Sequence, residues 1–420
     1  MATKTSTAIT KKIGLLIGDE DDWPAAIEAL AKRFGSPLAY GGKRYEMALE
    51  RVRIHPFRLK AATSYDVVID RLAYWHFTPR EWLKKAALLN GTYLLNDPFT
   101  FQSMEKHSAY CAMIRLGLNI PETWLIPPKI GPDTQKYRVT AARYHDFFDL
   151  PEIAGRIGYP LYMKPYDGGG WRGVSRIGDE KELMQAYDSS GHMIMHLQAG
   201  LDNFEVFVRS LGIGPQVMSL RYNPEQPMHG RYGVEHNFLS AEKGREARTI
   251  TKIINAAFRW DFNSCEAIIK GGVLWPIDFA NACPDIAITS LHYYFPWAIK
   301  SLLAWSLFAA VTERPMRVTM NLEDYFKIAD SERSYEEKLS AYEKLADAYF
   351  ETEKFEDFRA SHLQGLDEAM WELVQSPEFD AILVHTVRTT FPPHEHDQFI
   401  AHFRGLLRHW VEAEEKGGAT

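Results

Sequence analysis

Residues 159–174 combine a lysine with a dense cluster of glycines, a pattern suited to holding phosphate groups. Lys164 ends an apolar run, and four glycines follow it closely: Gly168, Gly169, Gly170 and Gly173. Because glycine has no Cβ, the backbone N–H groups of such a loop can converge on a phosphate while the lysine supplies a point charge. A structural hairpin without a ligand is the alternative interpretation.

The residues after the glycines distinguish between known phosphate-binding layouts. The glycines also match the GxGxxG dinucleotide fingerprint, but that motif requires a helix directly after them. Residues 174–178 are strand-like instead, and a helix is expected only from Asp179. The loop is therefore predicted to join two antiparallel strands and to fold over phosphates as a flap. A protein-kinase loop has this layout too, but no HRD or DFG motif follows.

A strand of the form apolar-x-Lys-Pro, followed by a glycine-rich hairpin and Gly-Val, resembles the ATP-grasp superfamily, in particular ligases of the D-alanine–D-alanine and ribosomal-protein glutamate types. In that family a second lysine lies on the helix that enters the nucleotide domain, before a Leu-Gly-x-x-x-Pro-x-Thr stretch. Here Lys106 precedes such a stretch at residues 116–123. The resemblance implies that Lys106 and Lys164 both contact ATP. Taken alone, Lys106 would be interpreted as a surface lysine on a helix.

The same resemblance assigns the next apolar strand to the adenosine of ATP. Gln198 and Glu205 are seven residues apart, which resembles the hinge-to-ribose spacing in D-alanine–D-alanine ligase-like members. It implies that Gln198, Ala199 and Leu201 contact adenine and that Glu205 contacts the ribose hydroxyls. Hinge groups can pair with the adenine edge, and a carboxylate can accept two hydroxyl protons. An exposed strand residue is the alternative for Glu205.

Two carboxylates and an amide are expected to lie near the phosphates. Lys-Gly-Gly at residues 270–272 predicts a hairpin, with Glu266 on one strand and Asp278 on its neighbour. Carboxylate and amide oxygens together with ATP phosphates usually hold Mg²⁺ in phosphoryl transfer. The resemblance makes Glu266, Asp278 and Asn281 the ligands of Mg²⁺, with Mn²⁺ as an alternative ion. A structural salt bridge is the alternative role for Asp278.

The spacing of these ligands departs from the family pattern. The family usually places its carboxylate two residues before the Asn, but Phe279 occupies that position here. Asp278 and Asn281 are three residues apart, so in a regular strand their side chains would face opposite ways. Either a β-bulge turns one of them inward, or the motif is altered and Asp285 participates.

The remaining candidate residues concern the transferred phosphoryl group and the substrate. Arg221 lies where a family arginine would stabilise charge on that group, and an exposed strand arginine is the alternative. Arg231 falls in a loop that could cover the substrate, and His292 lies just past the strand that carries Asp278 and Asn281. A metal site at the histidines of residues 394–402 is disfavoured, because they flank a helix start and no Cys accompanies them.

Three regions are expected to position these residues, giving a combined α/β and α+β fold. Strands alternate with helices in residues 1–97, which predicts a parallel sheet in a pre-ATP-grasp domain. The resemblance makes residues 98–315 an ATP-grasp domain, with the nucleotide between two β-sheet subdomains. Residues 316–420 are predicted to be helical throughout, with apolar residues at three-to-four spacing on a charged background. This helical extension could mediate a homo-oligomer.

Composition narrows the class of protein. The 420 residues carry a net charge of −7, whereas a nucleic-acid binder usually has a basic surplus. The three cysteines form no CxxC spacing, which favours a reducing compartment. The most apolar run, residues 297–311, is too short to cross a bilayer. We therefore expect a cytoplasmic enzyme without nucleic-acid or membrane partners.

The resemblance implies an ATP- and Mg²⁺-dependent carboxylate–amine ligase. In such an enzyme the γ-phosphoryl group passes to a substrate carboxylate, and an amine or similar nucleophile then displaces phosphate. The substrates would be a small-molecule or peptide carboxylate and an amine. A small-molecule kinase on the same scaffold, or a non-catalytic protein that binds a nucleotide or a partner, are the alternatives. The motifs do not select the substrates, since specificity lies in loops that vary within a fold.

Overall fold

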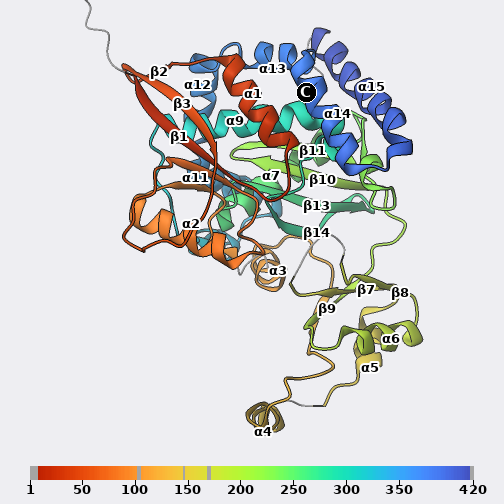
Figure 1. Ribbon diagram of the computed structural model, residues 1–420. Coiled ribbons are helices and arrows are strands. Elements are labelled where there is room, and N and C mark those ends of the chain that lie inside the picture. Colours follow the sequence, from red (N-terminus) through yellow and green to blue (C-terminus); the bar gives the residue numbers. More distant parts are fainter. Residues whose placement is uncertain (1–7, 102–105, 145–146, 168–171, 417–420) are drawn as a thin grey trace, which may run out of the picture.

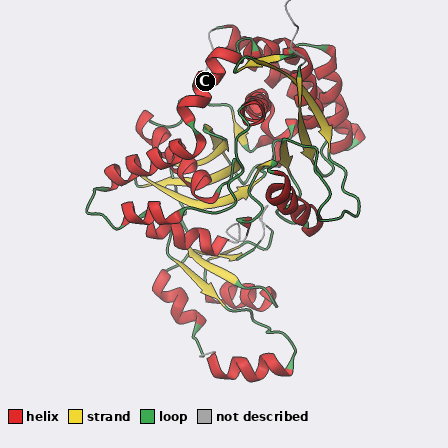
Figure 2. Ribbon diagram, turned by 90° about the vertical axis from the view of Figure 1, so that its left-hand side faces the viewer, coloured by secondary structure: helices red, strands yellow, loops and turns green. Residues whose placement is uncertain are grey.

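The computed structural model describes residues 8–101, 106–144, 147–167 and 172–416 (Figure 1). Two five-stranded sheets and one four-stranded sheet organise these residues. Two views show that the four-stranded sheet and its helices project from the main body as a small subdomain (Figures 1 and 2). Three of the predicted phosphate-loop glycines, Gly168, Gly169 and Gly170, lie outside the described residues.

The N-terminal sheet has the strand order β2-β3-β1-β4-β5. Its parallel pairs, β1–β3, β1–β4 and β4–β5, confirm the predicted parallel sheet. The hairpin of β2 and β3 was not expected, and it turns at Gly41 and Gly42, whose φ angles are 56° and 74°. The elements are β1 (Ile9–Leu16), α1 (Asp22–Phe34), β2 (Leu38–Tyr40), β3 (Lys43–Arg51), β4 (Val67–Asp70), α2 (Phe77–Asn90) and β5 (Tyr93–Leu95).

The small subdomain carries the hairpin that flanks the glycine loop. Its sheet has the order β6-β9-β7-β8, and β7 pairs antiparallel with β8 as predicted. The side chain of Asp179 accepts a hydrogen bond from the Glu182 amide and caps α6, so the helix begins where the sequence placed it. The elements are β6 (Thr123–Ile126), α4 (Gln135–Tyr144), α5 (Leu150–Ile157), β7 (Leu161–Pro165), β8 (Ser175–Ile177), α6 (Glu180–Ser190) and β9 (Met195–Ala199).

The central sheet is antiparallel, with the order β12-β11-β10-β13-β14. The predicted hairpin is confirmed, and Gly271 and Gly272 form its turn with φ angles of 61° and 71°. Helix α7 packs on one face of the sheet, and α3 packs against β14. The elements are α3 (Lys106–Arg115), β10 (Val206–Ile213), β11 (Gln216–Tyr222), η2 (Met228–Gly230), β12 (Tyr232–Gly233), α7 (Ala241–Phe258), β13 (Phe262–Lys270) and β14 (Val273–Ala282).

An apolar helix runs through the centre of the main body. It consists of α8 (Ile288–Leu291), η3 (His292–Tyr294) and α9 (Phe295–Val311). Residues Ile288–Val311 are long and apolar enough to cross a membrane by composition alone, but 89% of their most apolar window is buried inside the protein. Such burial is typical of the core helix of a folded domain rather than of a membrane span.

The C-terminal helices complete the same hydrophobic core. As predicted, residues beyond 321 are almost entirely helical, and helices α13, α14 and α9 pack against α1 (Figure 1). One continuous core contains Ile13 of the N-terminal sheet, Trp305 of α9 and Trp410 near the C-terminus. The elements are α10 (Leu322–Ala329), α11 (Tyr335–Phe350), α12 (Thr352–His362), α13 (Leu366–Val374), α14 (Pro377–Thr390), η4 (Pro393–Glu395) and α15 (His396–Glu415).

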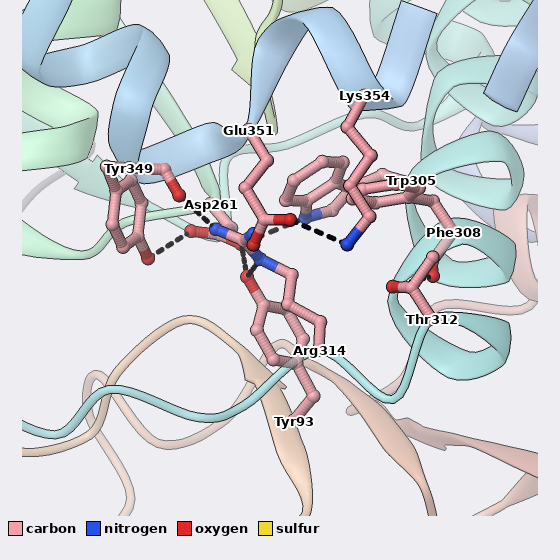
Figure 3. A network of polar contacts seen from close by, with 9 residues as sticks. All are labelled: Tyr93, Asp261, Trp305, Phe308, Thr312, Arg314, Tyr349, Glu351 and Lys354. Carbon is pink, nitrogen blue, oxygen red and sulfur yellow. Dashed lines mark hydrogen bonds and ion pairs between the residues drawn. The ribbon is translucent and has the colours of Figure 1, made fainter. Parts of the chain in front are cut away.

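A buried polar network joins the three regions (Figure 3). The Asp261 carboxylate accepts hydrogen bonds from the hydroxyls of Tyr93 and Tyr349 and from the Trp305 indole. Arg314 donates to the Tyr93 hydroxyl at 2.8 Å and pairs with Glu351 at 2.6 Å. The network therefore connects the N-terminal sheet, the start of the β13–β14 hairpin and the C-terminal helices.

Candidate functional site

A bulge in β14 brings the predicted metal ligands to one face of the central sheet. Asn281 pairs with Ser264, and Asp278 pairs with Glu266. Between these pairs β13 advances by two residues and β14 by three, so β14 contains one extra residue. Ser264 and Glu266 lie on the same face of β13, and their partners therefore share that face. This bulge is one of the two arrangements that the sequence left open.

Asp285, the other alternative, is held by its own loop. One carboxylate oxygen accepts a hydrogen bond from the Ala287 amide at 2.9 Å, and the other accepts one from the Ser290 hydroxyl at 2.6 Å. Both oxygens are thus already engaged in shaping the segment that follows β14. The geometry favours the bulge over an altered motif.

Helix α3 delivers Lys106 to the carboxylates. The Tyr110 hydroxyl donates to the Ile277 carbonyl at 2.7 Å, which fixes α3 against β14. Lys106 is buried, and its Nζ lies 3.3 Å from one carboxylate oxygen of Asp278. The salt-bridged state that the sequence offered as an alternative for Asp278 is therefore formed, but it engages a single oxygen.

The second Asp278 oxygen, Oδ1, is buried and has no hydrogen-bond partner among the described residues. Buried polar atoms in native proteins usually have a partner, so this carboxylate oxygen is a candidate contact for a cation. The Asn281 amide nitrogen donates to the carbonyls of Ser264 and Asp278, at 3.3 and 3.4 Å. Its amide oxygen therefore remains available to a cation.

These residues fit a Mg²⁺ ion that is shared with phosphates. Among the described residues, no group of three or more His, Cys, Asp or Glu side chains is arranged to hold a metal. Mg²⁺ commonly uses only one or two protein carboxylates and takes its other ligands from substrate phosphates and water. Glu266, Asp278 and Asn281 form a set of that kind.

Lys164 approaches the same carboxylates from the small subdomain. Its Nζ donates to the Gln198 side-chain oxygen at 2.8 Å, and Gln198 donates to the Thr123 hydroxyl at 2.8 Å. Burial lowers the pKa of Lys164 to about 8, with Lys106 acting in the same direction and Asp278 in the opposite one. These electrostatic effects require the two lysines and Asp278 to lie near one another, so the two sheets face each other across this cluster.

Of the predicted adenosine contacts, Gln198 and Ala199 lie on β9 of the small subdomain, and Leu201 and Glu205 lie in the segment between β9 and β10. Gln198 is buried and holds Lys164, and Ala199 ends β9. Leu201 is half-buried and packs against the main core. The exposed Glu205 carboxylate accepts a hydrogen bond from the Gly271 amide at 2.8 Å and thereby caps the β13–β14 turn. Their adenine and ribose roles stay predictions.

Gly173 is the one predicted phosphate-loop glycine that the described residues include. Its φ angle is 70°, a left-handed conformation that disfavours residues with a side chain. A Cβ at this position would lie 2.9 Å from the Pro165 ring. The tight return of the hairpin therefore requires glycine here.

The sequence placed a catalytic arginine at residue 221, but the register brings Arg209 to the carboxylates instead. Arg221 pairs across the sheet with Val208, which pairs with Ala267, so Arg221 shares the face opposite Glu266. Arg221 is also exposed and forms an ion pair with Glu235.

Arg209 is the cation that sequence reasoning missed. It pairs with Glu266 in the register, and its guanidinium lies 3.5 Å from the Glu266 carboxylate. Burial raises the pKa of Glu266, while Arg209 lowers it. Arg209 also donates to the Ser264 hydroxyl, at 3.1 and 3.2 Å from two of its nitrogens. In the sequence, Arg209 interrupts a mostly apolar strand, which could have marked it as a functional residue. Only the strand register shows that its side chain lies on the same face as Glu266.

The two residues suggested for the substrate are held by contacts of their own. His292 is only 2% exposed, and its Nδ1 accepts a hydrogen bond from the Tyr293 amide at 2.8 Å. Burial lowers the pKa of His292 to about 4, so it is neutral at physiological pH. Arg231 donates to the Gln226 carbonyl at 3.0 Å and to the Tyr222 hydroxyl at 3.3 Å. Their substrate roles stay predictions.

No protein-family model and no curated protein sequence matches the chain. Among solved structures, it is similar to the RimK domain protein ATP-grasp from Sphaerobacter thermophilus, with 16% identity, coverage of 70% of this chain and 99% of that chain, and a TM-score of 0.47. The D-alanine–D-alanine ligase from Bacillus anthracis complexed with ATP has 13% identity, coverage of 72% and 97%, and a TM-score of 0.47. The ADP complex of N5-carboxyaminoimidazole ribonucleotide synthetase has 16% identity, coverage of 67% and 72%, and a TM-score of 0.46.

The described residues divide the predicted site between two sheets and one helix. One sheet carries the lysine and the glycine hairpin, the facing sheet carries the acidic strand, and helix α3 supplies the second lysine between them. The sequence motifs predicted this arrangement.

Proposed function

We propose that the chain is an ATP- and Mg²⁺-dependent ligase that joins a carboxylate to an amine or a similar nucleophile. The observation that carries the proposal is the polar cluster between the two sheets. It combines two lysines, two carboxylates and an amide, and one Asp278 oxygen is buried without a partner among the described residues. A triphosphate with a divalent cation would supply the charges that this cluster needs.

The side chains of this cluster have separate roles in binding Mg-ATP. Lys106 and Lys164 neutralise phosphate oxygens, and Glu266, Asp278 and Asn281 would hold Mg²⁺, which supplies further positive charge at the phosphates. Arg209 holds the Glu266 carboxylate in place from the neighbouring strand.

The reaction proceeds in two steps. A substrate carboxylate oxygen attacks the γ-phosphorus of ATP, the bond to the bridging oxygen breaks, and ADP leaves. The nitrogen of the amine then attacks the acyl carbon, the carbon–oxygen bond to phosphate breaks, and the amine loses a proton. The protein contributes positioning and charge neutralisation, and no covalent enzyme nucleophile is needed.

The test is a screen of carboxylates and amines for ADP and phosphate release, with mass detection of the conjugate. We expect release that depends on both substrates in the wild type and its loss in Asp278→Ala. A phosphorylated product that accumulates without a conjugate would indicate a kinase instead. A purified chain without affinity for ATP in the presence of Mg²⁺ would overturn the proposal.

A further inference from the structure

Four consecutive ring side chains are exposed where β4 leads into α2. They are Tyr74, Trp75, His76 and Phe77. The exposed fractions of Tyr74, Trp75 and Phe77 are 45%, 57% and 70%. Single exposed apolar side chains are common, but contiguous ones mark binding surfaces. We call residues 71–77 the ring loop.

The ring loop has a fixed backbone. At its start the Asp70 carboxylate accepts hydrogen bonds from the amides of Leu72 and Ala73, at 2.9 and 3.0 Å. At its end the Arg80 guanidinium donates to the carbonyls of Ala73 and Tyr74, at 2.6 and 2.7 Å. The rings are therefore presented by an ordered segment, which reduces the entropy lost when a ligand binds.

The topology of the N-terminal sheet favours a ligand at this position. Strand β1 lies between β3 and β4, so the strand order reverses next to the carboxyl end of β4. Ligands of open α/β sheets bind in the crevice at such a reversal. The ring loop follows the carboxyl end of β4 at this reversal.

Contacts of the flanking residues Asp70 and Arg80 with two other segments place the ring loop near the polar cluster around Asp278. The Asp70 carboxylate lies 4.0 Å from the thiol of Cys283, two residues beyond the predicted metal ligand Asn281. The Arg80 guanidinium lies 5.3 Å from the centre of the Phe101 ring, five residues before Lys106.

The arginines of this region differ in how they are paired. Arg71 is already paired with Glu20 at 2.8 Å. Arg172, beside the glycine hairpin, is exposed and forms no ion pair within the described part of the chain. A guanidinium binds a carboxylate well, and aromatic side chains stack on a flat ring.

We propose that the ring loop selects carboxylate substrates that carry an aromatic ring, with the ring on Trp75 and Phe77. This inference rests on the proposed ligase function and narrows its carboxylate substrate to an aromatic acid. A short aliphatic acid offers these exposed rings no flat surface on which to stack.

Calorimetric binding of 3-phenylpropionate and of propionate tests the inference, with Mg²⁺ and a non-hydrolysable ATP analogue present. We expect the full-length wild type to bind 3-phenylpropionate at least about ten-fold more tightly, which corresponds to 1.4 kcal/mol. Trp75→Ala combined with Phe77→Ala should remove the preference while leaving nucleotide affinity unchanged. The matched control, Leu88→Ala with Leu89→Ala, removes exposed apolar side chains elsewhere on α2 and should keep it.

Equal binding of the two acids, or an unchanged preference in the ring variant, would overturn the inference. A change of oligomeric state in the ring variant, measured by light scattering, would assign the rings to a second copy of the chain and also overturn it. Ring-dependent binding of 3-phenylpropionate without any ADP release would uphold this site while the ligase proposal fails. The two failures are thus distinguishable.

Discussion

Two buried polar clusters of this molecule differ in how completely their groups are paired. Around Asp261 both carboxylate oxygens accept hydrogen bonds, and Arg314 donates to a hydroxyl, a carbonyl and a carboxylate (Figure 3). Around Asp278 one oxygen has no partner among the described residues, and Lys164 has a pKa near 8. The first cluster is complete in the protein alone, and the second is not.

This difference separates a structural role from a binding role. An unpaired buried polar group costs roughly 1–3 kcal/mol, and a charged one costs more. A folded chain tolerates that cost where a ligand later supplies the partner. We therefore expect changes around Asp261 to lower stability, and changes around Asp278 to lower activity with little effect on stability.

The largest effect is expected in the structural cluster. Arg314→Met leaves the Asp261 carboxylate without its neighbouring cation and should lower the free energy of unfolding by about 3–5 kcal/mol. Urea denaturation of the full chain measures this change. Lys354→Met removes an exposed ion pair of the same network and should cost less than about 1 kcal/mol. Equal losses in the two variants would contradict the structural assignment.

The next effect concerns the incomplete cluster. Asp278→Asn should lower kcat/KM for ADP release about 10²–10³-fold, because the side chain loses its charge at the phosphates. Its melting temperature should stay within a few degrees of the wild type. Asp285→Asn serves as the comparison, and its dependence on Mg²⁺ concentration should remain that of the wild type. A Mg²⁺ requirement altered only in Asp285→Asn would refute the bulge assignment.

A smaller effect distinguishes two arginines on neighbouring strands. Arg209→Met should lower kcat/KM by roughly 10-fold or more, because Glu266 loses the buried cation that holds it. Arg221→Met should change it less than about three-fold, since its ion pair with Glu235 is exposed. Steady-state ADP release with both substrates measures the two values. The reverse order would restore the assignment made from the sequence.

These arginines also show what the sequence could and could not predict. Local patterns sufficed to predict the β7–β8 and β13–β14 strand pairs, because each depends on neighbouring residues. Lys106 was singled out only through the family resemblance, and the ATP contacts of Lys106 and Lys164 stay predictions. The choice between Arg209 and Arg221 depends on pairing between strands, which a strand pattern does not specify.

Long-range polar pairing was equally inaccessible from the sequence. The Asp261 network joins residues separated by up to 221 positions, as between Tyr93 and Arg314. No short motif marks its members. The bulge in β14 was recognisable as an alternative, since a spacing of three residues conflicts with the two-residue period of a strand.

The smallest expected effect is a pH dependence of nucleotide binding. Lys164 loses its charge above a pKa of about 8, so the Kd for Mg-ATP should be nearly constant from pH 7 to 7.5 and rise by up to about ten-fold between pH 8 and 9. The pKa lies below the ordinary lysine value, so the folded apo protein binds fewer protons than the unfolded chain between pH 8 and about 10. The contribution of Lys164 to stability should therefore increase with pH in the window where affinity declines.

Calorimetric titration with Mg-ATP across this pH range measures the affinity. Lys164→Arg provides the control, because the arginine side chain stays protonated throughout this pH range. Its affinity should vary little with pH, whatever its absolute value. An identical decline in both proteins would assign the titration to another group. Lys164 would then not be the titrating cation of the incomplete cluster around Asp278.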